Sequence, residues 1–165
     1  MADKMMSERL QPSLLDRLTD EDPSNLTETR EARVIDIRRL REIVQRDLSW
    51  LLNTNNNDGW INPQRHPLAA KSVLNYGVKD VAGDFAAKDR AQLIRKSIAL
   101  AIENYEPRIR KGSAHVEIRS ENISRDTIIS FDIRADMWAE PIPIELYLRS
   151  SVDVTTGQVS LERAG

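Results

Sequence analysis

Hydrophobic residues recur with helical spacing in the first two thirds of the chain and alternate with polar residues in the last third. In two segments the apolar positions lie three or four residues apart, which gathers them on one face of a helix. They are Val34, Ile37, Leu40, Ile43, Val44, Leu48 and Leu51 in the first segment, and Ala91, Ile94, Ile98, Ala101, Ile102 and Tyr105 in the second. The pattern predicts one helix from about Arg30 to Leu52 and another that ends just before Glu106.

After Arg108 the pattern changes to strict alternation, which is typical of strands with one buried face. The alternating segments are His115–Arg119, Thr127–Ala135 and Ile142–Leu148, followed by a hairpin that carries Val152, Val154 and Val159–Leu161. Apolar residues on only one side indicate an antiparallel sheet with one solvated face. Helices followed by strands predict an α+β fold, with N-terminal helices packed on one face of a C-terminal antiparallel sheet.

The first 29 residues are predicted to form a flexible extension, and residues 30–165 a single α+β domain. Within the extension, Leu14, Leu15 and Leu18 would lie on one side of a helix of about two turns. Such a helix is too short to be stable alone, since isolated helices below about 12 residues are marginal in water. We therefore expect this apolar hook, residues 14–18, to dock on its own domain or on another chain, and the sequence leaves both open.

Composition excludes several classes of partner. The 165 residues suffice for one core, and 24 basic against 26 acidic residues give no reason to expect attraction to nucleic acid. No cysteine is present, which excludes disulfides and thiolate chemistry and fits a reducing compartment. No apolar run approaches the roughly 20 residues of a membrane span, and the first residues lack a signal-peptide core. We expect a cytoplasmic protein without direct membrane insertion.

The segment between the two long helices is irregular. Asn53–Gly59 has turn chemistry throughout, and prolines and glycines interrupt residues 60–83. Ser72–Gly77 is a compact apolar segment that we expect to pack beneath the helices. The three tryptophans stand among apolar residues and are interpreted as core or interface anchors. They are Trp50, Trp60 and Trp138.

A charged corner stands where the second helix meets the first strand. Pro107 cannot continue the helix, because it lacks a backbone N–H and disfavours helical geometry at Glu106. The result is a rigid bend that displays an acid and a base. A cation two residues away favours an ionised, hydrogen-bonding Glu106 over a proton donor, provided that Arg108 reaches it.

Catalytic chemistry finds little support. Glu103, Asp132 and Asp136 are candidate partners for a general acid at Glu106, but no spacing places them opposite it. Neither His66 nor His115 stands in a metal-ligand spacing, and no phosphate loop or nucleophile elbow is present. We therefore expect no enzyme, metal, cofactor or small-molecule substrate. An α+β domain with an apolar hook, a charged corner and an available strand edge is better interpreted as an interaction protein.

Four blocks that extend over most of the chain form a recognisable set. They are Pro12–Leu18 with Thr19-Asp20-Glu21-Asp22-Pro23, then Arg46–Thr54, Ser72–Gly77, and Ile102–Arg110 around Glu106-Pro107-Arg108. This set resembles the TssE family of type VI secretion baseplate subunits, which is related to phage-tail baseplate wedge proteins once described as lysozyme-like. Asn55-Asn56-Asn57 departs from the charged residue more usual in the family after the Asn-Thr pair.

The resemblance implies a structural role. Glu106 and Arg108 would supply charge-assisted hydrogen bonds to a helical bundle made by neighbouring wedge subunits, with Pro107 holding the loop shape. The strands from His115 to Leu161 would template the first ring of contractile sheath subunits by strand pairing. Leu14, Leu15 and Leu18 would tether the subunit to other wedge proteins. The assembly would be cytoplasmic and docked at a membrane.

Two alternatives remain at this point. The same fold serves in the baseplate wedge of a contractile phage or phage-like tail, which genome neighbours would distinguish from a secretion system. A lysozyme-like muramidase is the less favoured alternative, because Arg108 argues against a neutral Glu106.

Overall fold

The chain folds as two compact units, residues 1–46 and 47–165. The computed structural model describes residues 10, 12–20, 23–25, 35–80, 87–119, 127–138 and 143–163. The predicted boundary between an extension and a domain, at residues 29 and 30, lies outside the described residues and stays a prediction. Across the described residues, no helix combines the length and the apolar character that a membrane span requires.

The first unit holds α2 (Leu14–Leu18) and the beginning of α3 (Ile37–Leu52), which continues into the second unit. The start of α3 lies later than the sequence pattern predicted. The Asp36 carboxylate accepts a hydrogen bond of 2.6 Å from the backbone N–H of Arg39, as an N-cap residue does. This cap fixes the helix start at Ile37, because an orphan N–H of the first turn is satisfied there.

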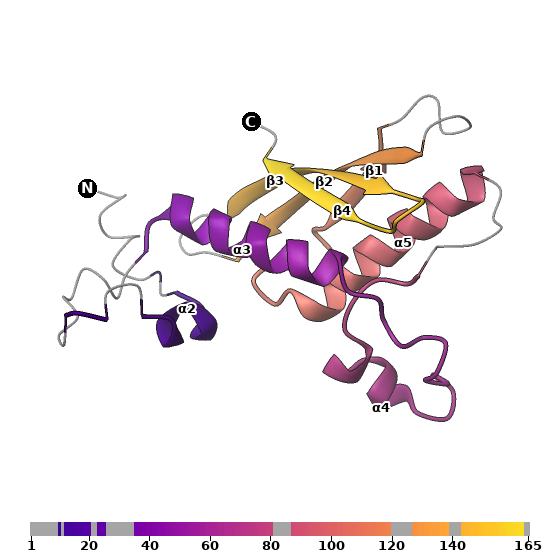
Figure 1. Ribbon diagram of the computed structural model, residues 1–165, viewed down its shortest axis with the longest axis horizontal. Coiled ribbons are helices and arrows are strands. Elements are labelled where there is room, and N and C mark those ends of the chain that lie inside the picture. Colours follow the sequence, from indigo (N-terminus) through magenta and orange to yellow (C-terminus); the bar gives the residue numbers. More distant parts are fainter. Residues whose placement is uncertain are drawn as a thin grey trace. The chain divides into compact units, whose positions relative to one another are not determined.

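The second unit contains a four-stranded antiparallel sheet with the strand order β1-β2-β3-β4 (Figure 1). The strands are β1 (His115–Ile118), β2 (Ile128–Met137), β3 (Ile144–Asp153) and β4 (Val159–Arg163). Alternate residues of the two central strands, β2 and β3, are buried, as the period of two requires. The α+β prediction, helices first and an antiparallel sheet afterwards, is confirmed.

Apolar side chains of the sheet share one face with the helix α5 (Ala87–Tyr105), which runs along one side of the sheet (Figure 1). The fully buried positions of β2 and β3 include Phe131, Ile133, Met137 and Leu148, and those of α5 include Ala91, Ile98 and Ile102. The α5 positions are those that the helical spacing predicted. Burying each of the larger side chains, those of Phe, Ile, Met and Leu, stabilises the fold by about 1.5–3 kcal/mol, which makes this face the core of the unit.

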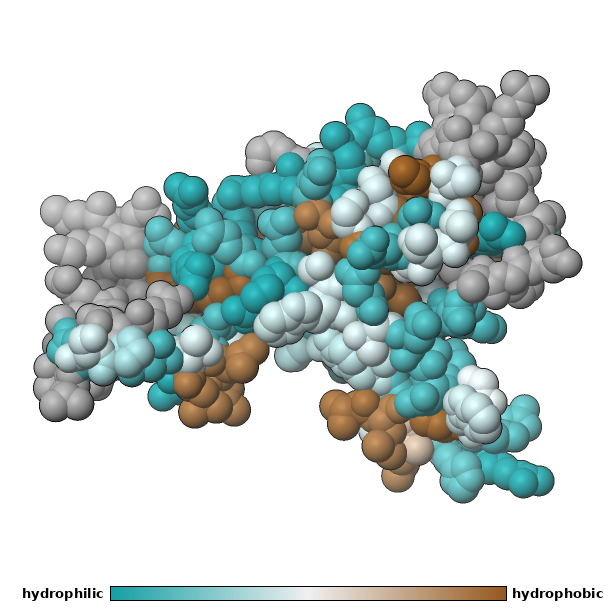
Figure 2. Space-filling model, viewed as in Figure 1, coloured by the Kyte–Doolittle hydropathy of each residue, from teal (hydrophilic) through white to brown (hydrophobic). Residues whose placement is uncertain are grey.

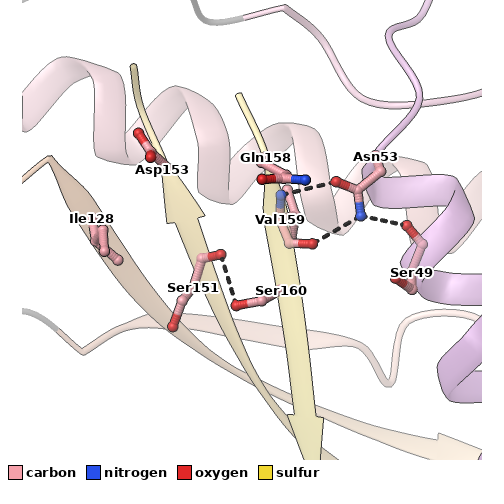
Figure 3. Close-up of a pocket in the computed structure, with 8 residues that line it drawn as sticks. All are labelled: Ser49, Asn53, Ile128, Ser151, Asp153, Gln158, Val159 and Ser160. Carbon is pink, nitrogen blue, oxygen red and sulfur yellow. Dashed lines mark hydrogen bonds between the residues drawn. The ribbon is translucent and has the colours of Figure 1, made fainter. Parts of the chain in front are cut away.

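One side-chain amide ties the end of α3 to the edge strand β4. Asn53 Nδ2 donates to the carbonyl oxygens of Ser49 and Val159, both at 2.8 Å, and the Val159 N–H donates to Asn53 Oδ1 at 2.9 Å (Figure 3). The amide thus pairs with Val159 as a neighbouring strand would. It occupies the first outward-facing backbone groups of β4.

Residues 54–78 form a lobe that carries α4 (Pro67–Ala70) and the short 3-10 helix η2 (Val73–Asn75). Its centre is Asn75, which is 7% exposed. The Asn75 side chain accepts from the Asn57 N–H at 2.9 Å and donates to Asp58 Oδ1 and the Ala70 carbonyl. A fully hydrogen-bonded buried amide of this kind fixes the loop in one conformation.

The expectation that residues 72–77 pack beneath the helices is wrong for their apolar side chains. Val73 and Leu74 are 80% and 64% exposed, while the polar Asn75 takes the buried position. Trp60 and Leu68 are exposed in the same lobe, and Figure 2 shows apolar side chains gathered on its surface. All three tryptophans are exposed by half or more, which excludes the core interpretation for them.

Gly77 allows the lobe to close. Its φ is +119°, and a Cβ at this position would lie 2.2 Å from the Thr54 carbonyl oxygen. We expect Gly77→Ala to lower the free energy of unfolding by about 2 kcal/mol or more, because it adds a backbone clash to a left-handed conformation. Urea denaturation of the purified chain measures this.

The matched control is Gly59→Ala in the same lobe, where an added Cβ meets nothing within 4 Å. It should change stability by no more than about 0.5 kcal/mol. Equal effects of the two substitutions would contradict the role given to Gly77.

Candidate functional site

The Glu-Pro-Arg corner, residues 106–108, begins one residue after α5 ends. The Glu106 N–H still donates to the Ile102 carbonyl at 3.0 Å, and the Ile109 N–H returns to the Glu106 carbonyl at 3.1 Å. Pro107 is exposed between them. The corner is therefore a tight turn closed by a backbone hydrogen bond directly after the last turn of α5. The helix ends before Pro107, as the sequence predicted.

The carboxylate of Glu106 faces inward. Its side chain is 5% exposed and accepts three hydrogen bonds from Arg108. The donors are the backbone N–H at 3.0 Å, Nε at 2.7 Å and Nη2 at 2.5 Å. Two parallel bonds from a guanidinium to one carboxylate are the strongest common ion-pair geometry in proteins. The acid and the base of the corner therefore bind each other first.

Arg108 also reaches across the unit to α3, where its Nη2 donates to Asp47 Oδ2 at 2.7 Å. Burial acts to lower the pKa of the Arg108 guanidinium, but the hydrogen bonds and charges of Glu106 and Asp47 outweigh it, so the pKa is raised. One cation thus links two carboxylates that stand 59 positions apart in the sequence. Asp47 lies in the sequence block Arg46–Thr54, but no spacing or motif in the sequence indicates that it joins the corner.

Two tyrosines pack next to this cluster. The rings of Tyr76 and Tyr105 meet edge to face, with centroids 5.4 Å apart. Burial raises the pKa of Tyr76, and the negative charges of Asp47 and Glu106 raise it further. The Tyr105 hydroxyl donates to the Asn75 carbonyl at 2.7 Å, which fastens the lobe to the end of α5. Residues from three of the four sequence blocks therefore meet around the corner.

The outgoing side of the corner pairs with the end of β2. Ile109 forms an antiparallel bridge with Met137. The Trp138 N–H donates to the Arg108 carbonyl at 2.7 Å and the Arg110 N–H to the Asp136 carbonyl at 2.8 Å. Trp138 itself is 66% exposed. The sequence gave no reason to place this tryptophan beside Arg108, because 29 residues separate them.

In the first unit, the apolar hook forms the helix α2, and its leucines are exposed (Figure 2). The exposed fractions are 71% for Leu14, 48% for Leu15 and 74% for Leu18. Asp16 holds the hook to α3 by a two-pronged ion pair with Arg46, at 2.5 and 3.1 Å. The hook therefore binds its own unit through an ion pair, while Leu14 and Leu18 stay largely exposed and Leu15 about half exposed.

The other acidic candidates have separate partners. Glu103 accepts a hydrogen bond from the Gly112 N–H at 2.9 Å, and Asp132 lies within 4 Å of Arg119 and Arg149.

Both histidines are exposed. An open hollow of about 500 Å³ lies between the end of α3 and the β3–β4 hairpin (Figure 3), and Glu106 does not line it. Nothing among the described residues brings a second carboxylate across a cleft from Glu106.

The corner should behave as a coupled unit in unfolding. We expect Arg108→Met to lower the free energy of unfolding by about 3 kcal/mol or more, because it leaves the buried Glu106 charge unpaired. The double variant Glu106→Met with Arg108→Met should be closer to the native chain than this single variant. Urea denaturation of the native chain, the two single variants Glu106→Met and Arg108→Met, and the double variant measures the coupling. Strictly additive losses would contradict the coupling.

The ion pair of the hook should appear in a titration. The hydrogen bond from Arg46 lowers the pKa of Asp16 from 3.8 to about 2; burial opposes this change, and the Ser13 hydroxyl and neighbouring arginines support it. Because the folded pKa is depressed, the pair stabilises the hook above about pH 4, and this contribution disappears as the pH falls through 2. Carboxyl ¹³C NMR should show a midpoint near 2. The variant Arg46→Gln should return the midpoint toward 3.8.

Comparison with known proteins shows the family of this chain. Residues 38–142 match the family model described as baseplate wedge protein gp25, which includes α3, the lobe, α5, the corner, β1 and β2. The chain matches none of the curated proteins and none of the solved structures. Because the match covers more than half of the chain, this protein belongs to the gp25 family of baseplate wedge proteins, a structural component of phage-type baseplates.

Proposed function

We propose that this chain is the TssE-type baseplate subunit of a type VI secretion system, joining wedge subunits and nucleating the contractile sheath. The observation that carries the proposal is the pairing inside the corner: Glu106 is buried and bonded to Arg108, which in turn binds Asp47. A site built this way displays a fixed shape. The family match supports a role in a baseplate. The proposal of a secretion system rests on the resemblance of the four sequence blocks to the TssE family.

The grip would depend on Arg108. Its Nε and Nη2 are engaged by Glu106 and Asp47, while no described residue accepts a hydrogen bond from Nη1. The side chain is 28% exposed, so this nitrogen can meet an acceptor on a partner. Because two carboxylates already hold the guanidinium in one orientation, the Arg108 side chain loses little rotamer freedom when it binds a partner. Glu106 thus acts on the partner through Arg108, while Pro107 presents the surface of the turn.

The same pairing argues against a muramidase. A general acid must carry a proton to deliver, and both oxygens of Glu106 accept hydrogen bonds from a guanidinium. The carboxylate is 5% exposed and lies apart from the hollow beside β4. A substrate would first have to break the Arg108 pair to reach it. We therefore propose a non-catalytic role.

For the sheath, we propose that an incoming strand pairs with β1. This strand is bonded to β2 on one side, and among the described residues no other strand pairs with it. The Arg119 N–H bonds inward to Ser130, so the backbone groups of Val116 and Ile118 point outward. Such an edge is a template for an added strand. At β4, by contrast, Asn53 already occupies the first outward groups.

For the hook, we propose a tether to other wedge proteins. The Asp16–Arg46 pair fixes its position on α3, while Leu14, Leu15 and Leu18 remain exposed. The assembly would lie in the cytoplasm against a membrane-bound complex. A phage-like tail is the second candidate function, since the family model covers wedge proteins of phage type. Neighbouring genes for a secretion ATPase, or for capsid and terminase, distinguish the two.

Assembly is tested by copurification. The chain is coexpressed with the other wedge subunits encoded beside it, as wild type or as Arg108→Lys. Lysine keeps the positive charge against Glu106 but loses the planar fork, so the fold should survive while recovery of the complex falls about tenfold. Alanine is the poorer choice here, because it strands a buried charge.

The matched control is Arg65→Lys, an exposed arginine of the lobe. It should copurify as the wild type does. Normal recovery of Arg108→Lys, with an unchanged melting temperature, would remove the corner from the proposed interface.

A further inference from the structure

Trp138 is a large apolar side chain that the fold holds at the surface beside the corner. The backbone N–H of Trp138 donates to the Arg108 carbonyl at 2.7 Å, next to the bridge between Ile109 and Met137. Ile109 and Met137 are buried at 4% and 0% exposed. Because side chains alternate along paired strands, the residues that flank the bridge point to the opposite side. The backbones of Arg108 and Trp138 therefore face each other across this ladder. The Trp138 side chain is 66% exposed, and the Arg108 side chain turns back to Glu106 and Asp47 and is 28% exposed.

This placement forgoes most of the stabilisation that burial of an indole would give, since about two thirds of the side chain stays in water. Yet the backbone at Trp138 is fixed by the ladder, and the residue before it is fully buried. The side chain is presented on a rigid element. Tryptophan and arginine are two of the residue types that are most enriched among the residues that carry binding energy at protein interfaces.

The charges of the corner say what kind of surface fits. Arg108 is already compensated by Glu106 and Asp47, and the exposed Arg110 stands opposite Asp136 in the ladder. Counting these five groups, three carboxylates against two guanidiniums leave a single negative charge. A polyanion such as nucleic acid or an anionic lipid surface would find no net attraction here. Apolar contact with a protein is the remaining source of affinity.

We propose that Trp138 is the apolar anchor of the surface that begins at the corner. It inserts into an apolar slot between helices of the neighbouring wedge subunits, beside the acceptor that Arg108 binds. This inference rests on the proposed function and adds a residue to it. Pro107 and Trp138 then exclude water from the Arg108 hydrogen bond, as the surround of an interface centre does.

The test uses the full chain and, as the probe, the purified complex of the other wedge subunits lacking this chain. We expect Trp138→Ala to raise the dissociation constant about 30-fold, the effect of losing an interface anchor. Trp138→Phe should lose clearly less, because it restores most of the apolar contact. The matched control Trp60→Ala removes a tryptophan that is 91% exposed and should stay within about threefold.

A second readout reports the indole directly. In a chain labelled with 5-fluorotryptophan, the ¹⁹F resonance of Trp138 should shift when the probe complex is added. The difference in its chemical shift between H₂O and D₂O, which reports solvent exposure, should disappear. The resonance of Trp60 should not move. A Trp138 resonance that stays unchanged in the bound chain would overturn the inference, whatever the affinities of the variants.

The outcomes separate the two proposals. If Arg108→Lys weakens binding and Trp138→Ala does not, the anchor is wrong and the corner stands. If neither variant weakens binding, the corner itself fails and the anchor fails with it. Equal losses for Trp138→Ala and Trp60→Ala overturn the anchor, because the effect is then not local to the corner.

Discussion

The bond between Glu106 and Arg108 organises the second unit of this protein. A glutamate at the end of α5 can be buried because a guanidinium two residues later returns to it across a proline turn, and because the same guanidinium reaches Asp47 on α3. Removing Arg108 would leave Glu106 as an unpaired buried charge, which destabilises the fold more than an apolar residue at that position would. The end of α5, the last turns of α3 and the edge of the lobe near Tyr76 therefore depend on one cation.

The polar interior of the lobe extends this arrangement. Asn75 takes the buried site and joins three backbone segments, while the apolar neighbours Val73 and Leu74 stay outside. This is the reverse of an ordinary folded loop, in which the polar residue faces water. Asn53 acts in the same way at β4, where one amide serves as a short strand (Figure 3). Side-chain amides carry a donor and an acceptor in one plane. Those of Asn53 and Asn75 therefore form hydrogen bonds that link separate elements of the second unit.

Sequence periodicity predicted the parts of this fold that depend on local pattern. The helix ahead of Glu106, the antiparallel sheet and the break at Pro107 all follow from spacing within one element. The predicted helix start near Arg30 was too early, because hydrophobic spacing does not register the Asp36 cap. Contacts between distant segments could not be predicted. Tertiary packing brings Asp47 to the corner, Asn75 inside the lobe and Trp138 beside Arg108. The spacing of hydrophobic residues indicates helices and strands, but it does not indicate which distant segments meet.

The amide of Asn53 gives the sheet a polarity. An additional strand approaching β1 finds an open row at Val116 and Ile118, whereas one approaching the start of β4 must first expel a side chain that already saturates Val159. Removing the Asn53 amide would free the outward backbone groups of Val159, and the sheet would lose this difference between the start of β4 and the β1 border.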